Sequence, residues 1–319
     1  QRPGFADSCL RSAIQAWNWA RKNPQVYYTL TYQKTLLNPA VATGDYGDAN
    51  ATDELTWAAI ELTLATRRDS FWIAAYPNKV FSGAKSIPGW NQVAALGLMS
   101  AFKSMDSLVG VVDTAGMQAS LLSLGNEGKT RRASNPYRVP VRAGDFYWGS
   151  SSVTANIALA ALHWYDVSRD TSYRNTAAAG LDWLLGRNAL GISYVTGFGT
   201  VSPLKPHHRP SGADGIPAPI PGFIIGGPNP QQSDAKDCEA AGASYPYESS
   251  IPAISWIDNE CSYASNEVAI NWNAPLVAIL GILQQGELSQ WEPDAVSPRS
   301  IARSGALLIL TSGPRALRL

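Results

Sequence analysis

The chain has 319 residues, of which 45% are hydrophobic and only 16% are charged. A chain of this length and composition is expected to fold as a globular protein with a large core. Its 25 basic and 25 acidic residues cancel to zero formal charge, which argues against an electrostatic nucleic-acid binder and a basic membrane-surface protein. A neutral polymer fits better, because 11 Trp and 13 Tyr offer aromatic faces, although large aromatic side chains more often fill a core.

No run of 18 apolar residues occurs in the sequence, so no membrane-spanning helix is expected. The start lacks a signal-peptide pattern, which indicates a mature, trimmed or incomplete chain. Three cysteines, Cys9, Cys238 and Cys261, lack the CxxC spacing of a zinc site. Cys238 and Cys261 can pair and leave Cys9 free, and such a disulfide would favour an extracellular setting.

The first predicted helix covers residues 5–22, where apolar residues recur at helical spacing until an Asn-Pro pair ends the pattern. Residues 25–48 show no steady period and are predicted to form a loop. A second helix is predicted to open with Thr52 as its N-cap. The acids that follow, Asp53 and Glu54, suit the positive end of the helix dipole.

A short break between helical runs occurs twice in the sequence. Arg68-Asp69-Ser70-Phe71 ends the second helix, and Arg169-Asp170-Thr171-Ser172-Tyr173 separates helical runs at 151–167 and 171–186. Two helices joined by a tight break form an αα-hairpin. The recurrence of the break therefore predicts a repeated helical architecture.

Further helical runs are predicted at 89–105 and 115–125, followed by a polar, basic link at 126–144. A last helix is predicted at Pro275–Leu283, because Pro275 is tolerated only near a first turn. No stretch alternates in the way that a sheet requires. The predicted fold class is therefore all-α.

Residues 188–260 differ from the helical part of the chain. These 73 residues hold 10 of the 21 prolines and show no long helical pattern. An irregular segment of this length in a compact domain is usually functional. The tail 286–319 also lacks useful periodicity, so the predicted domain covers residues 1–285 and the tail stays unassigned.

Two acids, Asp258 and Glu267, lie nine residues apart in a stretch rich in Trp, Tyr and Asn. Two carboxylates among aromatic and amide groups are what glycoside hydrolysis requires. On one regular helix, side chains nine residues apart point to roughly opposite faces. A shared site therefore needs Asp258 in a loop and Glu267 near a helix start. The alternative is that Asp258 and Glu260 are solvated loop acids and Glu267 lies beside a helix N-cap.

Two motifs carry a resemblance to a known family. The first is Tyr194-Val195-Thr196-Gly197-Phe198-Gly199 leading to Pro206-His207-His208-Arg209, and the second is Trp256-x-Asp258-x4-Tyr263-x3-Glu267-x-Ala269-x3-Asn273-Ala274. With them, residues 5–284 resemble the C-terminal part of the catalytic domain of glycoside hydrolase family 9, whose members are mostly inverting endo-1,4-β-glucanases. The resemblance implies an all-α (α/α)6 barrel, with about the first two of six hairpins absent from this chain.

The resemblance also implies roles for individual residues. Glu267 is expected to be the general acid that protonates the glycosidic oxygen, and burial among aromatic side chains would favour its protonated form. Asp258 is expected to support the site by hydrogen bonds to sugar hydroxyls or neighbouring groups, and His207 to grip hydroxyls beside the cleavage point. The expected substrate-binding residues, for several of which a core or surface role is the alternative, are Arg209, Tyr46, Trp148, Trp256, Tyr263 and Trp272.

Some members of the family hold a structural calcium where Asp53, Glu54 and Asn91 lie, and oxygen ligands suit that ion. No other cofactor is expected. The expected partner is cellulose or a related β-glucan, without nucleic acid or membrane, and the expected protein is a secreted monomer.

The chain departs from the family pattern at an important point. The Asp-Ala-Gly-Asp motif that carries the family's catalytic base is absent from the sequence. The segment Gly44–Asp48 looks similar, but it matches a different segment of the family. Without a base, Glu267 lacks its partner, and this chain alone is expected to be nearly inactive. Three hypotheses remain open: a cellulase, a non-catalytic β-glucan-binding remnant, and a hydrolase of another neutral polysaccharide.

Overall fold

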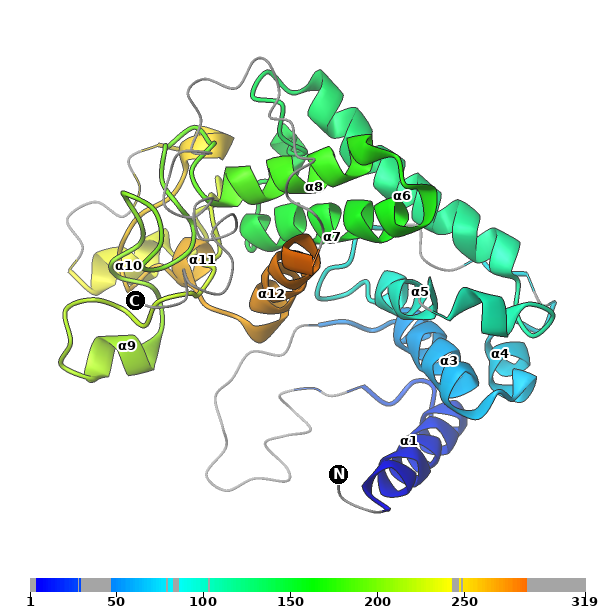
Figure 1. The fold of residues 1–319 in the computed structure, drawn as a ribbon. Coiled ribbons are helices and arrows are strands. Elements are labelled where there is room, and N and C mark those ends of the chain that lie inside the picture. Colours follow the sequence, from blue (N-terminus) through cyan, green and yellow to red (C-terminus); the bar gives the residue numbers. More distant parts are fainter. Residues whose placement is uncertain are drawn as a thin grey trace. The chain divides into compact units, whose positions relative to one another are not determined.

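The computed structural model describes residues 4–27, 29, 47–78, 80–82, 86–102, 104–242, 247 and 249–285 (Figure 1). Tyr46 and the tail 286–319 therefore lie outside the described residues. The chain forms two compact units, residues 1–121 and 122–319, and the single domain 1–285 stays a prediction. All regular elements in the described ranges are helices, which confirms the all-α prediction.

Unit 1 is built around α3, which packs against α4 and α5, while α1 contacts α3. Trp17 of α1 meets Phe71 of α4 edge-on, with ring centroids 5.8 Å apart, and Ala59 and Leu62 of α3 complete this core. The elements are α1 (Phe5–Lys22), α3 (Thr52–Thr66), α4 (Asp69–Ala75), α5 (Ala94–Phe102) and the 3-10 turn η1 (Met105–Leu108).

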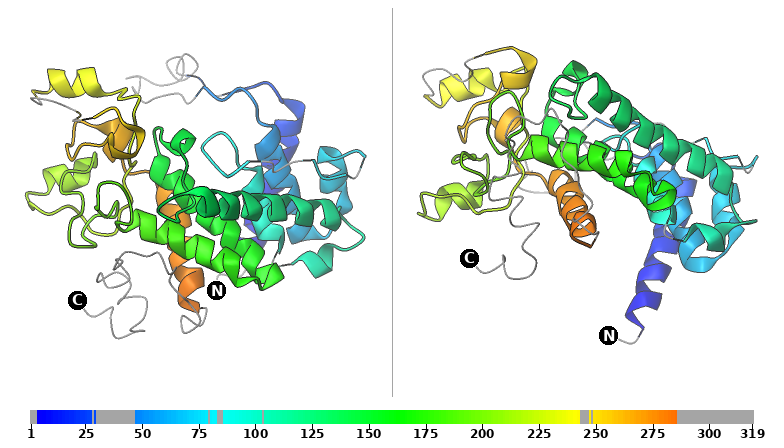
Figure 2. Two further views of the ribbon diagram at one scale, coloured as in Figure 1. Left: turned by 90° about the horizontal axis from the view of Figure 1, so that it is seen from above. Right: turned by 45° about the horizontal axis from the view of Figure 1, so that its top comes forward.

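Unit 2 contains the α7–α8 hairpin, against which α12 packs (Figure 2). Gly180 of α8 lies against Ala158 of α7, and a Cβ there would come within 3.0 Å of the alanine methyl. The elements are α6 (Thr114–Ser134, which begins in unit 1), η2 (Ala143–Asp145), α7 (Ser150–Ser168), α8 (Thr171–Leu184), α9 (Arg209–Ala213), α10 (Ala235–Ala240), η3 (Pro252–Ile254), α11 (Tyr263–Asn266) and α12 (Ile270–Gln285).

The two predicted breaks are confirmed as helix ends with the same backbone geometry. Arg67 closes α3 with φ 58°, and Arg169 closes α7 with φ 54°, both in the left-handed region. A left-handed residue turns the chain out of a helix, and α4 and α8 begin two residues later. Asp170 then caps α8, because its side chain accepts a hydrogen bond from the Ser172 N–H at 2.9 Å.

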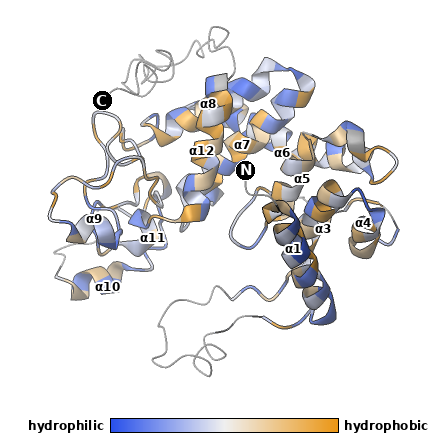
Figure 3. Cartoon of the chain, turned by 60° about the horizontal axis from the view of Figure 1, so that its bottom comes forward, coloured by the Kyte–Doolittle hydropathy of each residue, from blue (hydrophilic) through white to orange (hydrophobic). Residues whose placement is uncertain are grey.

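The helix α7, coloured by hydropathy in Figure 3, is buried along most of its length. Nearly all residues from Ser150 to Leu162 of α7 are buried, because α8 and α12 both pack against α7. Among the helices that the structure describes, none is both long and apolar enough to cross a membrane.

Several helix boundaries differ from the sequence prediction. The helix α5 covers only Ala94–Phe102 of the helical run predicted at 89–105. The helix α6 continues to Ser134, into the predicted link, because Arg131 pairs there with Glu127 one turn before it and with Asp145. The helix α12 begins at Ile270 and contains Pro275 in its sixth position. Thr52 is the first residue of α3 and Ala51 is its N-cap, since the Thr52 hydroxyl donates to the Asn50 side chain instead.

Candidate active site

The irregular segment predicted at 188–260 attaches to one end of the α7–α8 hairpin. The Ser151 N–H at the start of α7 donates to the Gly226 carbonyl at 3.0 Å, and the Tyr194 N–H donates to the Leu184 carbonyl at the end of α8 at 2.7 Å. An isolated antiparallel bridge joins Val195 to Ile224. Loop residues of the first motif are therefore held by backbone hydrogen bonds to the hairpin.

Glu267 lies between two helices. The short helix α11 ends at Asn266, the Glu267 N–H donates to the Tyr263 carbonyl at 3.3 Å, and α12 begins three residues later. Asp258 lies in an irregular stretch before α11. Asp258 thus lies in a loop and Glu267 near a helix start, which is the placement that a shared site requires and that the alternative of solvated loop acids also allows.

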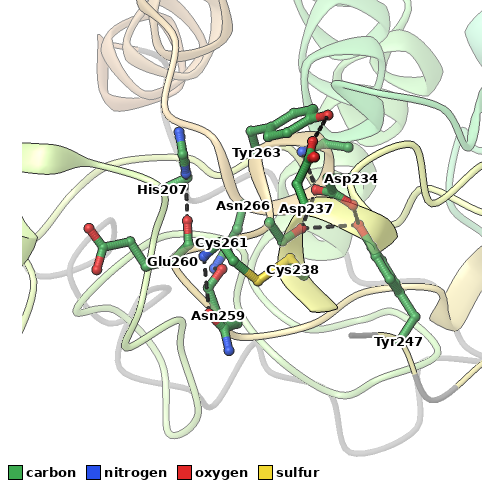
Figure 4. Close-up of a disulfide and its surroundings, with 12 residues drawn as sticks. His207, Asp234, Asp237, Cys238, Tyr247, Asn259, Glu260, Cys261, Tyr263 and Asn266 are labelled. Atoms are coloured by element: carbon green, nitrogen blue, oxygen red, sulfur yellow. Dashed lines mark hydrogen bonds between the residues drawn. A yellow bond between two sulfur atoms is a disulfide. The ribbon is translucent and has the colours of Figure 1, made fainter. Parts of the chain in front are cut away.

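His207 joins the two sequence motifs. Its N–H donates to the Asn266 carbonyl at 2.8 Å, and an isolated parallel bridge pairs His207 with Glu267. The His207 Nδ1 also bonds the Glu260 carbonyl, which can only accept, so this nitrogen carries the proton (Figure 4). With the proton on Nδ1, Nε2 is the ring nitrogen that can act as a hydrogen-bond acceptor.

One aromatic side chain bonds the Glu267 carboxylate, and two further rings pack in sequence beside it. The Trp148 indole N–H donates to Glu267 Oε2 at 3.1 Å, from a turn 119 residues earlier in the chain. The Tyr263 ring lies 5.1 Å from the Trp148 ring and 6.1 Å from the His207 ring, between centroids. Glu267 and these three rings are called the acid cluster below.

Tyr263 is held at its hydroxyl as well as its ring. The hydroxyl donates to Asp237 Oδ2 of α10 at 2.8 Å (Figure 4). Burial, together with this carboxylate, raises the pKa of Tyr263 to about 12. The hydroxyl therefore stays protonated at neutral pH and keeps donating to Asp237.

The Asp258 carboxylate accepts hydrogen bonds from the backbone of the first motif's approach, at Leu204 and Lys205. Both of its carboxylate oxygens accept from the Leu204 N–H, at 3.1 and 2.9 Å, and Oδ1 also accepts from the Lys205 N–H at 2.8 Å. These bonds fix the chain just before Pro206 and His207. Of the two kinds of hydrogen bond expected for Asp258, the structure shows those to neighbouring groups.

The predicted sugar-binding rings occupy different environments. Trp148 is 42% exposed, whereas Trp272 is buried and packs against Gly149 and Gly226. A Cβ on Gly149, whose φ is 90°, would come within 3.0 Å of the Trp272 ring. Trp272 thus has the surroundings of a core residue, which is the alternative that the sequence left open, and its role in substrate binding stays a prediction. Trp256 is half-buried, and its indole nitrogen has no hydrogen-bond partner among the described residues.

Arg209 is exposed and is the first residue of α9, next to the histidines of the first motif. This position leaves its guanidinium accessible to a ligand. Tyr46, the other predicted stacking residue, lies outside the part of the chain that the structure describes.

The sequence analysis missed a buried carboxylate at Asp234. This side chain is fully buried and accepts hydrogen bonds from Tyr247, Ser262 and Ala264 (Figure 4). Nothing in the local sequence marks it, because its partners lie 13 to 30 residues away. An Asp before a short helix is usually explained as an N-cap, yet this side chain makes no capping bond to α10.

A disulfide joins Cys238 of α10 to Cys261, two residues before α11 (Figure 4). The Cα atoms are 5.0 Å apart, and Cys9 is free and exposed. The pairing considered from the sequence is confirmed. It links α10 to the segment that carries the Glu260 carbonyl, which accepts from His207.

We expect reduction of this disulfide to destabilise unit 2. A cross-link between residues 23 apart lowers the entropy of the unfolded chain. In the chain-entropy treatment this raises the free energy of the unfolded state by about 3 kcal/mol. The free energy of unfolding of a Cys238→Ser/Cys261→Ser variant should fall by about this amount in urea titration. Cys9→Ser is the matched control and should unfold like the parent. Equal stability of all three proteins would contradict the prediction.

The predicted metal ligands lie in unit 1. Asp53 Oδ2 accepts from the Val93 N–H at 2.6 Å, and Asp53 Oδ1 is buried without a hydrogen-bond partner in the described ranges. Burial, and then the nearby charge of Asp53, raises the pKa of Glu54. No three His, Cys, Asp or Glu side chains are grouped as a metal site anywhere in the described residues, so a cation here would also need the Asn91 amide or backbone oxygens.

Sequence comparisons relate the chain to glycoside hydrolases. The sequence model of glycosyl hydrolase family 9 matches residues 1–280. A xyloglucan-specific endo-β-1,4-glucanase of Bacteroides ovatus is 39% identical over 290 residues, which cover 88% of this chain and 47% of that protein. Endoglucanase C of Cellulomonas fimi is 31% identical over 292 residues, covering 86% of this chain and 24% of that protein.

Solved structures give the same relationship. A family 9 protein of Bacteroides ovatus superposes with a TM-score of 0.72 at 35% identity, covering 87% of this chain and 48% of that one. The family 9 endoglucanase J30 gives a TM-score of 0.73 at 29% identity, covering 87% and 50%. The chain thus spans half or less of the length of these relatives. Its helical hairpins, its two motifs and the match over residues 1–280 show that the chain belongs to glycosyl hydrolase family 9.

Proposed function

We propose that the protein hydrolyses internal β-1,4-glucosidic bonds of cellulose and related β-glucans, with Glu267 as the general acid. The observation that carries this proposal is the acid cluster, in which Glu267 lies beside His207 of the first motif and bonds the Trp148 indole. The relatives named as endoglucanases support the substrate class.

The acid cluster supports a division of roles. The Trp148 N–H can only donate and occupies Glu267 Oε2, so Oε1 is the oxygen that would carry the proton to the glycosidic oxygen. The free Nε2 of His207 accepts from a sugar hydroxyl, and the exposed Arg209 donates to others. The exposed face of Trp148 suits stacking on a sugar ring.

We further propose that the reaction inverts the anomeric centre, as the family resemblance implies. Inversion needs a second carboxylate about 6.5–9.5 Å from the acid, on the far side of the sugar. Asp258 is not that base in this proposal, because backbone N–H groups of Leu204 and Lys205 already occupy both of its oxygens. The base stays unassigned, since the Asp-Ala-Gly-Asp motif is absent from residues 1–319.

A binding experiment and a product analysis test the proposal. Cello-oligosaccharides should bind, and the products that form, at the low rate expected of a chain without the base motif, should come from cellulose, xyloglucan or mixed-linkage glucan but not from chitosan. Binding without products would favour the non-catalytic remnant, and products from xylan or chitosan alone would favour another polysaccharide hydrolase. An extracellular location and a monomeric state belong to the same proposal, and the disulfide supports the location.

A structural calcium at Asp53 and Glu54 is the second part of the proposal. The unpartnered Asp53 Oδ1 supports it, because a cation would satisfy that oxygen and offset the charge of Glu54. At free calcium about 100-fold above Kd, the free energy of unfolding should rise by about 2.7 kcal/mol. Thermal unfolding with calcium and with a chelator measures this, and Asp53→Asn should remove the difference. Identical melting of the parent protein in both solutions would exclude the site.

A further inference from the structure

Three contacts converge on the fully buried carboxylate of Asp234 (Figure 4). Its Oδ1 accepts from the Tyr247 hydroxyl at 2.7 Å. Its Oδ2 accepts from the Ser262 hydroxyl at 2.8 Å and from the Ala264 N–H at 2.6 Å. Such bonds to an ionised acceptor are the strong ones, and they offset the cost of burying the charge.

Two of these donors belong to the start of α11. Ser262 is its N-cap, with its hydroxyl accepting from the Ser265 N–H, and Ala264 lies in its single turn. A helix of four residues has almost no stability of its own. The position of α11 therefore depends on what binds it, and Asp234 binds it through the Ser262 side chain and the Ala264 backbone.

The acid cluster follows from the position of α11. Tyr263 is the first residue of this helix, and its ring faces Trp148 and His207. Glu267 directly follows the helix and donates its N–H to the Tyr263 carbonyl. A shift of α11 by 1 Å would change both contacts, and about 0.5 Å is the tolerance of a preorganised site.

We propose that Asp234 is a positioning residue for the general acid. It touches neither Glu267 nor a substrate, and it acts by holding α11 so that Glu267 Oε2 meets the Trp148 N–H. The catalytic meaning of this role rests on the proposed function of Glu267, whereas the positioning itself does not. The disulfide and the Tyr263–Asp237 bond tie α10 to the same segment, and Asp234 provides the buried attachment.

The Trp148 indole proton provides the test, because it reports the bond to Glu267 without any turnover. In the full chain labelled with ¹⁵N-tryptophan, the resonance is assigned with Trp148→Phe, and Glu267→Ala gives its position without the acceptor. We expect Asp234→Asn, which keeps the side-chain volume and one acceptor oxygen, to move the resonance toward that position. Asp234→Ala should move it further and speed its exchange with solvent.

Asp182→Asn is the matched control. Asp182 is also buried in unit 2, but it belongs to α8 and pairs with Arg187 at 3.4 Å. This variant should melt at a lower temperature and leave the Trp148 resonance in place. A resonance unmoved in Asp234→Asn, or moved equally in Asp182→Asn, overturns the proposal. Loss of all indole signals in Asp234→Ala would leave Asp234→Asn to decide.

The outcome is separable from that of the proposed function. If the resonance moves in Asp234→Asn while Glu267→Gln hydrolyses β-glucan like the parent, the positioning is correct and the acid assignment is wrong. If the resonance stays in place while Glu267→Gln loses hydrolysis, the acid assignment holds and Asp234 has no positioning role.

Discussion

Glu267→Gln is expected to lower the hydrolysis of soluble β-1,4-glucan by about 10²–10⁴-fold, the usual contribution of a general acid. Glutamine keeps an oxygen that accepts from the Trp148 N–H but carries no proton that it can give to a glycosidic oxygen. The affinity for cello-oligosaccharides should therefore be unchanged. Initial rates and isothermal titration calorimetry measure the two quantities separately.

The substrate provides an internal control for this prediction. An aryl cellobioside with a good leaving group needs little protonation, so the loss in Glu267→Gln should be much smaller on it. Glu260→Gln is the matched variant, because its side chain is exposed and only its backbone carbonyl contacts His207. Equal losses in both variants would contradict the acid assignment. Binding without turnover in the parent as well would favour the non-catalytic remnant.

Arg131→Met is expected to lower the free energy of unfolding by about 3–5 kcal/mol, as for other broken buried ion pairs. Arg131 donates to Asp145 Oδ2 at 2.8 Å, and both side chains are almost fully buried. Methionine fills similar space but leaves the Asp145 charge in the core with the Arg142 N–H as its hydrogen-bond donor and the exposed Arg142 guanidinium 3.5 Å away. Urea titration followed by tryptophan fluorescence measures the loss.

Two variants separate the charge effect from packing. Lys129 lies on α6, like Arg131, and forms an exposed ion pair with Asp170. Lys129→Met should therefore lower the free energy of unfolding by less than about 1 kcal/mol. Arg131→Met/Asp145→Asn removes both charges and should recover part of the loss. A cost for Arg131→Met no larger than that for Lys129→Met would show that the buried pair does not stabilise the unit. Because Asp145 precedes the turn that carries Trp148, Arg131→Met should also lower the affinity for glucan.

Local sequence patterns were sufficient for most helices. The 3.6-residue period and the recurrent Arg-Asp break gave α1, α3, α7 and α8, because these helices bury one face or more against neighbours. The ends of α6 and α12 were missed. Arg131 extends α6 through an ion pair with Asp145, a residue outside the helix that no periodicity includes.

The site was predicted in part, for a similar reason. The spacing within each motif marked Glu267, Asp258 and His207, and the two cysteines marked a pair. Burial decided the rest: Trp272 and Trp148 are both tryptophans in motif-like stretches, yet one packs against two glycines and the other is exposed.

The sequence by itself determined the helical class and the family and predicted Glu267 as the acid, since these depend on residue types at short spacing. Only the tertiary structure decided what surrounds that acid. Trp148 lies 119 residues from Glu267, and Asp234 reaches Ala264 across 30 residues. Such contacts form because an unpaired buried polar group is costly and most of them therefore have a partner. That partner is set by the packing of the whole unit, which no local pattern encodes.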